Sequence, residues 1–576
     1  MSRKSDNTTV MRWLYSVPGN RKWYVAVLLM FQVGVSLISV SYALVLRRLV
    51  DNATKGDSRR FWYCVIVIAV LAVSQQFCNI MVRWLNERGQ ASIENLFKLR
   101  LFRMLMAKDY GRVSAVHSGE WMNRLTNDTV VVASGYINIL PSLAGMIVRL
   151  VAAVVLLIIF DWRFAVILVP CGFVMVGLTY LFRKVLKRLH KHVQEKDGKV
   201  RVFLQERIES LMMVKAYVAE EQTTAAAEAT MNEHRAARMK RNHFSNLCSA
   251  GFNLALHGMY LFGACYCAYG ILTKAITYGT MTAVLQLISQ IQAPFANLSG
   301  FLPRYYAMTA SAERLMEVER YADDYDGEAL PLTEIQKYYQ AELAEIGIRD
   351  VNYTYYAASE RVDDTSKDQM PVVLSDISVA IRKGEYVAFT GPSGCGKSTI
   401  LRLLMGVYTP DSGERYMRSR NNTEKPLDGR SRRLFAYVPQ GNRLMSGPIR
   451  EVVSFADDAA DTGERVNEAL RIACAEEFVG TLAQGIETML GEHGMGLSEG
   501  QMQRIAIARA IYSGAPVLMF DESTSSLDEA TEATLLENLR ALTDRTVVIV
   551  THRPAALSIC DRVLRMEEDG VHEVTN

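Results

Sequence analysis

A short stretch in the C-terminal half has the residue types and spacing that hold phosphate groups. Residues 391–399 read Gly-Pro-Ser-Gly-Cys-Gly-Lys-Ser-Thr and match the pattern G-x-x-x-x-G-K-[ST]. Glycines let backbone N–H groups close around phosphate oxygens, and a helix that begins there adds partial positive charge. Lys397 is expected to contact the β- and γ-phosphates of a nucleotide, and the Ser398 hydroxyl to ligate Mg²⁺. The candidate nucleotide-binding residues of this loop are Gly391, Ser393, Gly394, Cys395, Gly396, Lys397, Ser398 and Thr399.

Further along the chain, two apolar runs end in residues suited to hydrolysis. The run 517–520 leads into Asp521, which suits the Mg²⁺ shell, and Glu522, which suits polarising the attacking water as general base. The run 547–550 leads to Thr551 and His552, whose imidazole is placed to sense the γ-phosphate. A phosphate loop alone fits many kinases and GTPases, or a chance match in a core. The ordered set at successive strand ends is far more specific.

These residues require buried strands that bring them to one edge of a sheet. Residues 387–390 predict such a strand before the phosphate loop, and residues 400–405 predict the helix after it. Residues 517–522 and 547–550 predict two further strands. The sequence therefore predicts an α/β P-loop ATPase domain over residues 341–576, preceded by a linker over residues 321–340.

The first 320 residues differ in character, because they hold long runs with almost no charge. A bilayer core about 30 Å thick takes about 20 apolar helical residues to cross. Six segments qualify or come close, and we expect an all-α transmembrane domain of six spans at residues 23–46, 61–82, 129–160, 164–182, 244–273 and 275–303. Residues 161–163 alone separate the third span from the fourth, which predicts a tight helical hairpin.

The connections after the second and fourth spans, residues 83–128 and 183–243, are long and poor in Gly and Pro. We interpret them as helices that continue the spans out of the membrane, with a break at 108–111, rather than as solvated loops. Basic residues at 183–191 place these extensions in the cytoplasm by the positive-inside tendency. The expected location is the plasma or inner membrane, with the C-terminal domain cytoplasmic.

Composition supports this division and excludes other classes of protein. The 576 residues are 50% hydrophobic and 22% charged, which excludes intrinsic disorder. The formal net charge of +3 argues against a nucleic-acid partner. The nine cysteines are odd in number and scattered, which is typical of reduced thiols rather than a disulfide framework. The start of the chain is polar and basic, without the pattern of a cleavable signal peptide.

With these motifs together, nearly the whole sequence resembles the ATP-binding cassette (ABC) transporter family, in its exporter (type IV) branch. Residues 497–501, Leu-Ser-Glu-Gly-Gln, resemble the signature LSGGQ, and Gln440 resembles the Q-loop glutamine. Residues 526–528 resemble the D-loop, His552 the switch histidine, and Tyr355 the aromatic that stacks on adenine. The resemblance implies ATP and Mg²⁺ as ligands. It implies catalytic Glu522, His552 and Gln440, metal-binding Ser398, Gln440 and Asp521, and nucleotide-binding Tyr355, Ser498, Gly500, Gln501 and Asp528.

One residue departs from the family pattern, because Glu499 stands where the signature usually has glycine. In the family the signature meets the γ-phosphate of ATP held by the other subunit. An anion aimed at that phosphate at 4 Å would cost about 4 kcal/mol at an effective dielectric constant near 20. We therefore expect Glu499 to point away and leave the contact to Ser498 and Gly500, the alternative being an impaired site.

One chain supplies one cassette and six spans, so the resemblance implies a dimer, most simply of identical chains. The expected function is ATP-driven export of a small molecule or lipid-like amphiphile by alternating access. The alternative is a membrane-anchored ATPase with a regulatory or gating role. We expect residues 108–113 and 213–218 of the two extensions to touch the cassettes, near Gln440.

Polar residues within the spans are the candidates for binding that substrate. Arg149 lies near the middle of the third span, where an intramembrane charge would suit an anionic compound. Gln286 and Gln290 in the sixth span recur at helical spacing and are candidates to line a cavity. The alternative for Arg149 is a guanidinium bonded to carbonyls or reaching water, and for the glutamines it is polar contacts between helices.

Overall fold

The computed structural model describes residues 7–357, 370–441, 444–455, 463–491, 496–567 and 570–574, with some side chains within 167–184 and 293–302 left out. The chain forms two compact units. A helical unit holds residues 7–99 and 126–315, and a cassette unit holds residues 100–125 together with 316–574.

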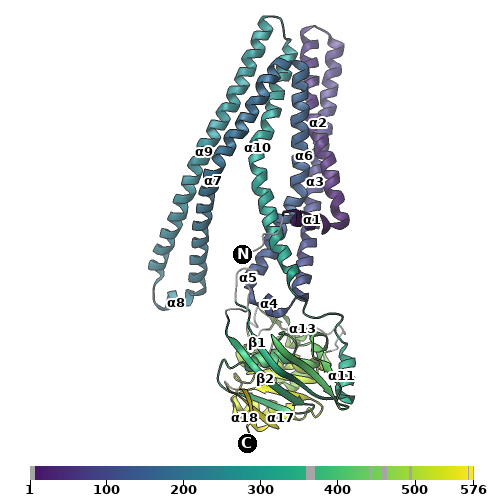
Figure 1. Cartoon of the computed structure of the whole chain (residues 1–576), viewed down its shortest axis with the longest axis vertical. Helices are drawn as coiled ribbons and strands as arrows, with labels where there is room; N and C mark the ends of the chain where they lie inside the picture. Colours follow the sequence, from purple (N-terminus) through teal and green to yellow (C-terminus); the bar gives the residue numbers. More distant parts are fainter. Residues whose placement is uncertain are drawn as a thin grey trace. The chain divides into compact units, whose positions relative to one another are not determined.

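The helical unit consists of long helices (Figure 1). Their apolar sequences explain the length, since 32 residues of α6 contain one charge. A short α1 and a 3₁₀ turn, η1, precede the long helices, and the last of these, α10, continues two residues into the cassette unit. The bounds are α1 (Asn7–Ser16), η1 (Gly19–Lys22), α2 (Trp23–Thr54), α3 (Ser58–Ala107), α6 (Thr129–Phe160), α7 (Trp162–Glu209), α8 (Leu211–Ala216), α9 (Glu220–Leu272) and α10 (Tyr278–Glu317).

Four helical stretches among the described residues are long and apolar enough to cross a membrane. These are Gly19–Thr54, Ser58–Ala107, Ser118–Phe160 and Glu220–Leu272. They include the first, second, third and fifth predicted spans. The fourth predicted span lies within α7, where some side chains are outside the description. The sixth, predicted to begin at residue 275, begins instead with α10 at Tyr278, because residues 273–277 form a turn in which the Ala275 N–H donates to the Gly270 carbonyl at 2.8 Å.

The connections between helices follow from local capping. Asp161 separates α6 from α7 and accepts hydrogen bonds from the backbone N–H groups of Arg163 and Phe164, which makes the tight turn. The second long connection is helical, since α7 and α9 lie side by side and α8 joins their ends (Figure 1). Buried residues of α2, α6, α7, α9 and α10 form one apolar core, which includes Val40, Leu157, Phe164, Cys267 and Leu287.

The first long connection is helical only in part. α3 ends at Ala107, where the sequence predicts a break, and Asp109 then caps α4 (Tyr110–Ala115) by accepting from the backbone N–H of Arg112 at 3.0 Å. α5 (Ser118–Asn123) and a π-helical turn, η2 (Arg124–Asp128), lead back to α6. Residues 100–125 pack with the cassette unit, so the compact units do not divide the chain at the single boundary near residue 320 that the sequence predicts.

The cassette unit contains a mainly parallel sheet and an antiparallel sheet. The first has the strand order β12-β11-β3-β10-β9-β6, with only β12 antiparallel, and the second has the order β2-β1-β4-β5. β3, β9 and β10 are buried almost throughout, as their continuous apolar runs predict. The strands are β1 (Leu343–Thr354), β2 (Val372–Arg382), β3 (Tyr386–Thr390), β4 (Ser412–Ser419), β5 (Glu424–Pro426), β6 (Phe435–Val438), β7 (Gly447–Pro448), β8 (Met489–Leu490), β9 (Val517–Asp521), β10 (Thr546–Val550), β11 (Arg562–Glu567) and β12 (Gly570–Val574).

The helices of this unit pack against the sheets. Within the predicted linker, α11 carries Ile335 and Tyr339 into the core, and the Tyr339 hydroxyl is 2.9 Å from Thr546 Oγ1. The segment before β1 is therefore packed on the cassette. The helices are η3 (Val318–Arg320), α11 (Leu332–Ala341), α12 (Lys397–Leu404), η5 (Gly429–Leu434), α13 (Ile449–Val453), α14 (Glu464–Ile472), α15 (Glu476–Thr481), η6 (Gly485–Glu487), α16 (Glu499–Tyr512), α17 (Glu529–Arg540) and α18 (Pro554–Ser558).

Candidate nucleotide site

The phosphate loop connects β3 to α12. Gly391 has φ +132°, and a Cβ at this position would lie 2.4 Å from the Met566 carbonyl oxygen. Gly396 has φ +101°, and a Cβ there would lie 2.7 Å from the Leu374 side chain. Both positions need glycine, for backbone conformation and for space. The loop predicted from the sequence thus wraps tightly at the end of a buried strand.

Lys397 points back into this loop. Its side chain is only 5% exposed, and Nζ donates to the carbonyl oxygens of Gly391 and Pro392, each at 2.8 Å. A loop that encloses an ammonium group in this way can offer its charge to the phosphate oxygens of a nucleotide. Cys395 Sγ lies 3.9 Å from the same nitrogen.

Asp521 ends β9 beside this loop. The carboxyl group is 1% exposed, and Oδ1 accepts a hydrogen bond from the Ser398 hydroxyl at 2.8 Å. Oδ2 accepts from the Tyr437 hydroxyl at 2.7 Å. A carboxylate and a hydroxyl are the hard oxygen donors that Mg²⁺ prefers, so the pair fits that ion. The described residues contain no group of three His, Cys, Asp or Glu placed to hold a metal, so Mg²⁺ here would take further ligands from phosphate and water.

Glu522 and Gln440 meet at the same edge of the sheet. Gln440 Nε2 donates to Glu522 Oε2 at 2.7 Å. Glu522 adopts φ +51°, which is uncommon for a residue with a side chain, and its N–H donates to the Val550 carbonyl of β10. Such strained backbone is concentrated at functional sites, where it fixes the direction of a side chain. The sequence assigns Gln440 and Glu522 to separate motifs, and in the structure they form one hydrogen-bonded pair.

His552 follows β10 and is exposed, and its neighbour Arg553 anchors the segment. Arg553 Nη1 donates to Glu532 Oε2 at 2.7 Å and to the Leu527 carbonyl at 2.9 Å. Arg553 therefore ties the segment after β10 to the residues that lead into α17. No sequence motif points to Arg553.

The signature residues form the cap and first turn of α16, which begins at Glu499. Ser498 caps the helix: its hydroxyl accepts from the Gln501 N–H, and the Gln501 side chain accepts from the Ser498 N–H. This capping box fixes the turn without glycine at the third position. Glu499 is exposed, and the helix N-terminus favours its negative charge. A Cβ at Gly500 would lie 2.9 Å from the Ser526 carbonyl.

Asp528 has a visible structural role as well as its predicted nucleotide role. Its side chain caps α17 by accepting from the Thr531 N–H at 2.9 Å. This hydrogen bond holds the pKa of Asp528 below its ordinary value.

Tyr355 lies just after β1, and its hydroxyl is 2.7 Å from Thr399 Oγ1 of α12. Its ring meets Tyr353 and Tyr408 edge-on, with centroids 5.2 and 5.7 Å away. Tyr110 of α4 stacks on Tyr408 at 5.9 Å. The sequence predicts that residues 108–113 touch a cassette near Gln440. In the structure Tyr110 meets Tyr408, and Arg112 donates to the Tyr356 hydroxyl at 3.2 Å.

Two family models match the chain in succession. The ABC transporter transmembrane region matches residues 25–295, and the ABC transporter cassette matches residues 374–525. The chain belongs to the ABC transporter family. It carries one transmembrane region fused to one ATP-binding cassette, so it is an ATP-driven half-transporter of the exporter type, and the predicted fold class is confirmed.

The transporter is similar to several known members. It is 26% identical to a multidrug resistance ABC transporter ATP-binding and permease protein of Lactococcus lactis, over 88% of this chain and 82% of that one. It is 26% identical to the ATP-dependent lipid A-core flippase of Vibrio cholerae, over 82% and 78%. A solved bacterial Atm1-family ABC exporter with ATP bound has the same fold, with a TM-score of 0.78, 21% identity, and coverage of 99% and 95%.

In the helical unit of the transporter, the candidate substrate residues hold unsatisfied polar atoms. Arg149 Nε, Gln286 Oε1 and Gln290 Oε1 are buried and have no hydrogen-bond partner among the described residues. Gln290 Nε2 donates to the Ser39 carbonyl of α2 at 2.7 Å, and Gln75 Nε2 donates to Ser39 Oγ at 3.1 Å. Gln290 therefore does connect two helices, as the alternative interpretation held, while the buried Oε1 atoms of Gln286 and Gln290 remain open to a ligand.

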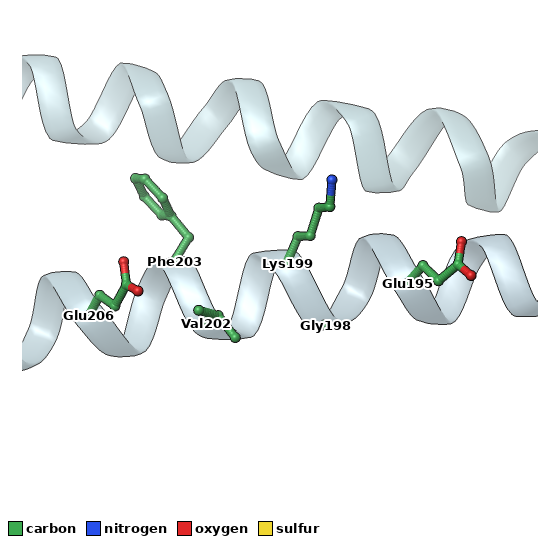
Figure 2. A pocket seen from close by; sticks show the side chains of 6 residues that line it. All are labelled: Glu195, Gly198, Lys199, Val202, Phe203 and Glu206. Carbon is green, nitrogen blue, oxygen red and sulfur yellow. The ribbon is translucent and has the colours of Figure 1, made fainter. Parts of the chain in front are cut away.

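A shallow open depression lies elsewhere, along α7. Figure 2 shows Lys199 and Phe203 directed toward the neighbouring helix, with Val202 turned away from it and Gly198 between Lys199 and Glu195. Glu195 and Glu206 complete the lining. None of the predicted site residues lines it.

Proposed function

We propose that this transporter is a homodimeric exporter with two ATP sites, each formed by the phosphate loop of one copy and the signature of its partner. The observation that carries the proposal is the Gln440–Glu522 hydrogen bond beside the Asp521–Ser398 pair. A chain that had lost hydrolysis would have little reason to keep a strained, oriented general base beside its metal ligands. One chain also contains both halves of a site, which favours an identical partner.

The roles of the residues follow from this geometry. Lys397 and the loop N–H groups bind the phosphates, and Tyr355 stacks on adenine. ATP with Mg²⁺ supplies the phosphoanhydride and the charge neutralisation at the γ-phosphate. Ser398 and Asp521 hold the ion, with Gln440 at its edge. Glu522 accepts the proton of the attacking water, Gln440 orients that carboxylate, and His552 contacts the γ-phosphate.

Closure of two cassettes over ATP would then be carried to the membrane through the helical connections. α4 is joined by the chain to α3 and packs on the cassette tyrosines. α8 presents an apolar surface, with Met212 84% and Val218 83% exposed, and a cassette of the dimer is the expected partner. The cassettes lie in the cytoplasm of a cell whose plasma or inner membrane holds the spans.

Outward transport of an amphiphile is supported by the relatives, which include a multidrug resistance protein and a lipid A-core flippase. Arg149, with its unpartnered Nε, favours an anionic group on that amphiphile. Gln286 and Gln290 add open hydrogen-bond acceptors on α10.

The test is ATP hydrolysis by this chain purified alone in lipid nanodiscs, compared with Glu522→Gln. We expect Mg²⁺-dependent hydrolysis that falls at least 100-fold in the variant, with ATP binding retained, because only the general base is lost. Compounds that stimulate the wild type become substrate candidates. If the wild-type chain, purified without another chain, hydrolyses no ATP, the homodimer proposal is overturned. If Glu522→Gln still hydrolyses ATP, the proposed role of Glu522 is overturned.

A further inference from the structure

The hydrogen bond from Tyr437 to Asp521 lies outside the motifs that predict the nucleotide site. Asp521 has two carboxylate oxygens, and each accepts one hydroxyl: Oδ1 from Ser398 at 2.8 Å and Oδ2 from Tyr437 at 2.7 Å. Ser398 belongs to the phosphate loop, whereas Tyr437 is on β6, which pairs in parallel with β9. The orientation of the carboxylate is thus set from two different elements.

Tyr437 is held in a set position relative to Asp521. It is half-buried on β6, and its ring packs against the apolar core that includes Val517 and Met519 of β9. In the parallel pairing of β6 with β9, Tyr437 lies opposite Met519, two residues before Asp521. The backbone pairing therefore keeps the phenol hydroxyl within reach of the carboxylate.

We propose that Tyr437 is a positioning residue for the magnesium ion. Its hydroxyl occupies Oδ2 and fixes the carboxylate plane, so that Oδ1 and the Ser398 hydroxyl face the metal together. Removing a hydrogen-bonding partner of this kind lowers metal affinity about 10-fold to 100-fold in other sites. The inference rests on the proposed ATP–Mg²⁺ site, and it concerns metal affinity rather than turnover.

The test uses Tyr437→Phe in the full-length Glu522→Gln chain in nanodiscs, with Mn²⁺ as the paramagnetic probe. Mn²⁺ binding to the ATP complex is titrated by electron paramagnetic resonance, and ATP binding is measured separately in EDTA. Tyr386→Phe is the matched control, because its hydroxyl is also inside the cassette unit and donates to the Leu539 carbonyl at 2.6 Å, in a different apolar cluster from Tyr437. We expect about tenfold weaker Mn²⁺ binding in Tyr437→Phe only, with ATP binding in EDTA unchanged.

Unchanged Mn²⁺ affinity in Tyr437→Phe would overturn the proposal, as would an equal loss in Tyr386→Phe. A second variant, Asp521→Asn, should abolish Mn²⁺ binding to the ATP complex. Adding Tyr437→Phe to Asp521→Asn should then cause no further change in the Mn²⁺ signal. If the wild type does not hydrolyse ATP, the proposed function fails while the Mn²⁺ measurement still decides this inference.

A separate observation concerns the tyrosines between α4 and the adenine end of the site. Tyr408 is stacked on Tyr353 at 5.2 Å and on Tyr110 at 5.9 Å, and it meets Tyr355 edge-on at 5.7 Å. All four belong to the cassette unit. One ring thus contacts the expected adenine platform and the helix that leads toward the membrane.

We infer that Tyr110 supports the Tyr355 platform through Tyr408, so that α4 senses the base of the nucleotide and not only its phosphates. Aromatic pairs of this kind contribute about 1 kcal/mol, which corresponds to about a fivefold change in affinity. The inference also rests on the proposed role of Tyr355.

The test compares ATP with inorganic triphosphate, which has no base, in the full-length Glu522→Gln chain. Tyr110→Leu should weaken ATP binding about fivefold and leave triphosphate binding unchanged, whereas Tyr110→Phe should behave as the wild type. The effect should disappear in the Tyr355→Leu background. Equal losses for both ligands, or a loss that persists with Tyr355→Leu, would overturn the inference. A Tyr355→Leu variant that binds ATP normally would instead remove the proposed role of Tyr355.

Discussion

Glu499 occupies the signature position where the family usually has glycine. It is the first residue of α16 and is exposed, and the Ser498–Gln501 capping box holds the turn through groups that do not include it. A carboxylate at a helix N-terminus is stabilised by about 0.5 kcal/mol. The helix start thus accommodates this departure from the signature pattern, and we still expect Ser498 and Gly500 to make the γ-phosphate contact.

Glu499→Gly is expected to change the hydrolysis rate less than threefold and to lower stability by about 0.5 kcal/mol, because the favourable interaction of the carboxylate with the helix N-terminus is lost. Steady-state hydrolysis and thermal unfolding in nanodiscs measure the two effects. A gain of tenfold or more in hydrolysis would show that the carboxylate does repel the phosphate.

Arg149→Ala is expected to abolish the stimulation of hydrolysis by anionic amphiphiles and to leave basal hydrolysis unchanged, because the guanidinium, whose Nε has no partner among the described residues, is the expected anion contact. Arg149→Lys, which keeps the charge, serves as the matched control and should retain part of the stimulation. Equal stimulation of the Ala variant and the wild type would reduce Arg149 to a structural residue.

At the scale of elements, the ion pair between Arg553 and Glu532 connects the end of β10 to α17. Glu532 is 2% exposed, and its Oε1 has no partner among the described residues, so Arg553 alone compensates the buried charge. Loss of one partner from a buried pair costs about 3 kcal/mol, whereas loss of both costs less.

Arg553→Leu should therefore lower the melting temperature of the cassette by about 8 °C and reduce hydrolysis, because His552 is the adjacent residue. Adding Glu532→Leu should restore part of the melting temperature. Thermal unfolding with hydrolysis of the same samples measures both. If the double variant is less stable than Arg553→Leu, the loss of stability in Arg553→Leu does not come from leaving the buried Glu532 charge without its partner.

In the whole molecule, the helical unit exposes an apolar surface on α8 and its flanks that a partner could cover. Met212, Tyr217 and Val218 are each more than 70% exposed. Patches of this kind outside the membrane usually mark protein contacts.

Met212→Asp should reduce hydrolysis at least tenfold and leave ATP binding and expression unchanged, because the side chain is 84% exposed and its expected role is to contact a cassette of the dimer. Met231→Asp on α9 is the control, since that side chain is also exposed. Hydrolysis and nucleotide binding are measured on the same preparations. Full activity of Met212→Asp would exclude α8 from the expected contact.

The nucleotide site was largely predictable because local sequence determines its parts. The glycines of the phosphate loop, the acids after β9 and the histidine after β10 follow buried strands, and parallel strands bring their carboxyl ends to one edge. Tyr437 and Arg553 were missed, since a lone tyrosine or arginine has no local signal. Their importance arises only from what β6, β9 and α17 place beside them.

The family, the phosphate-binding chemistry of residues 391–399 and the helical spans could all be predicted from sequence alone. Each depends either on residues that are neighbours in the chain or on the length of an apolar run. Three features became visible only in the folded structure. Residues 100–125 pack with the cassette, Gln440 donates a hydrogen bond to Glu522, and Tyr110 of α4 stacks on a tyrosine of the cassette. These are contacts between residues far apart in sequence. They form only when separate elements bury apolar surface together, and no periodicity within one element records which partner it will have.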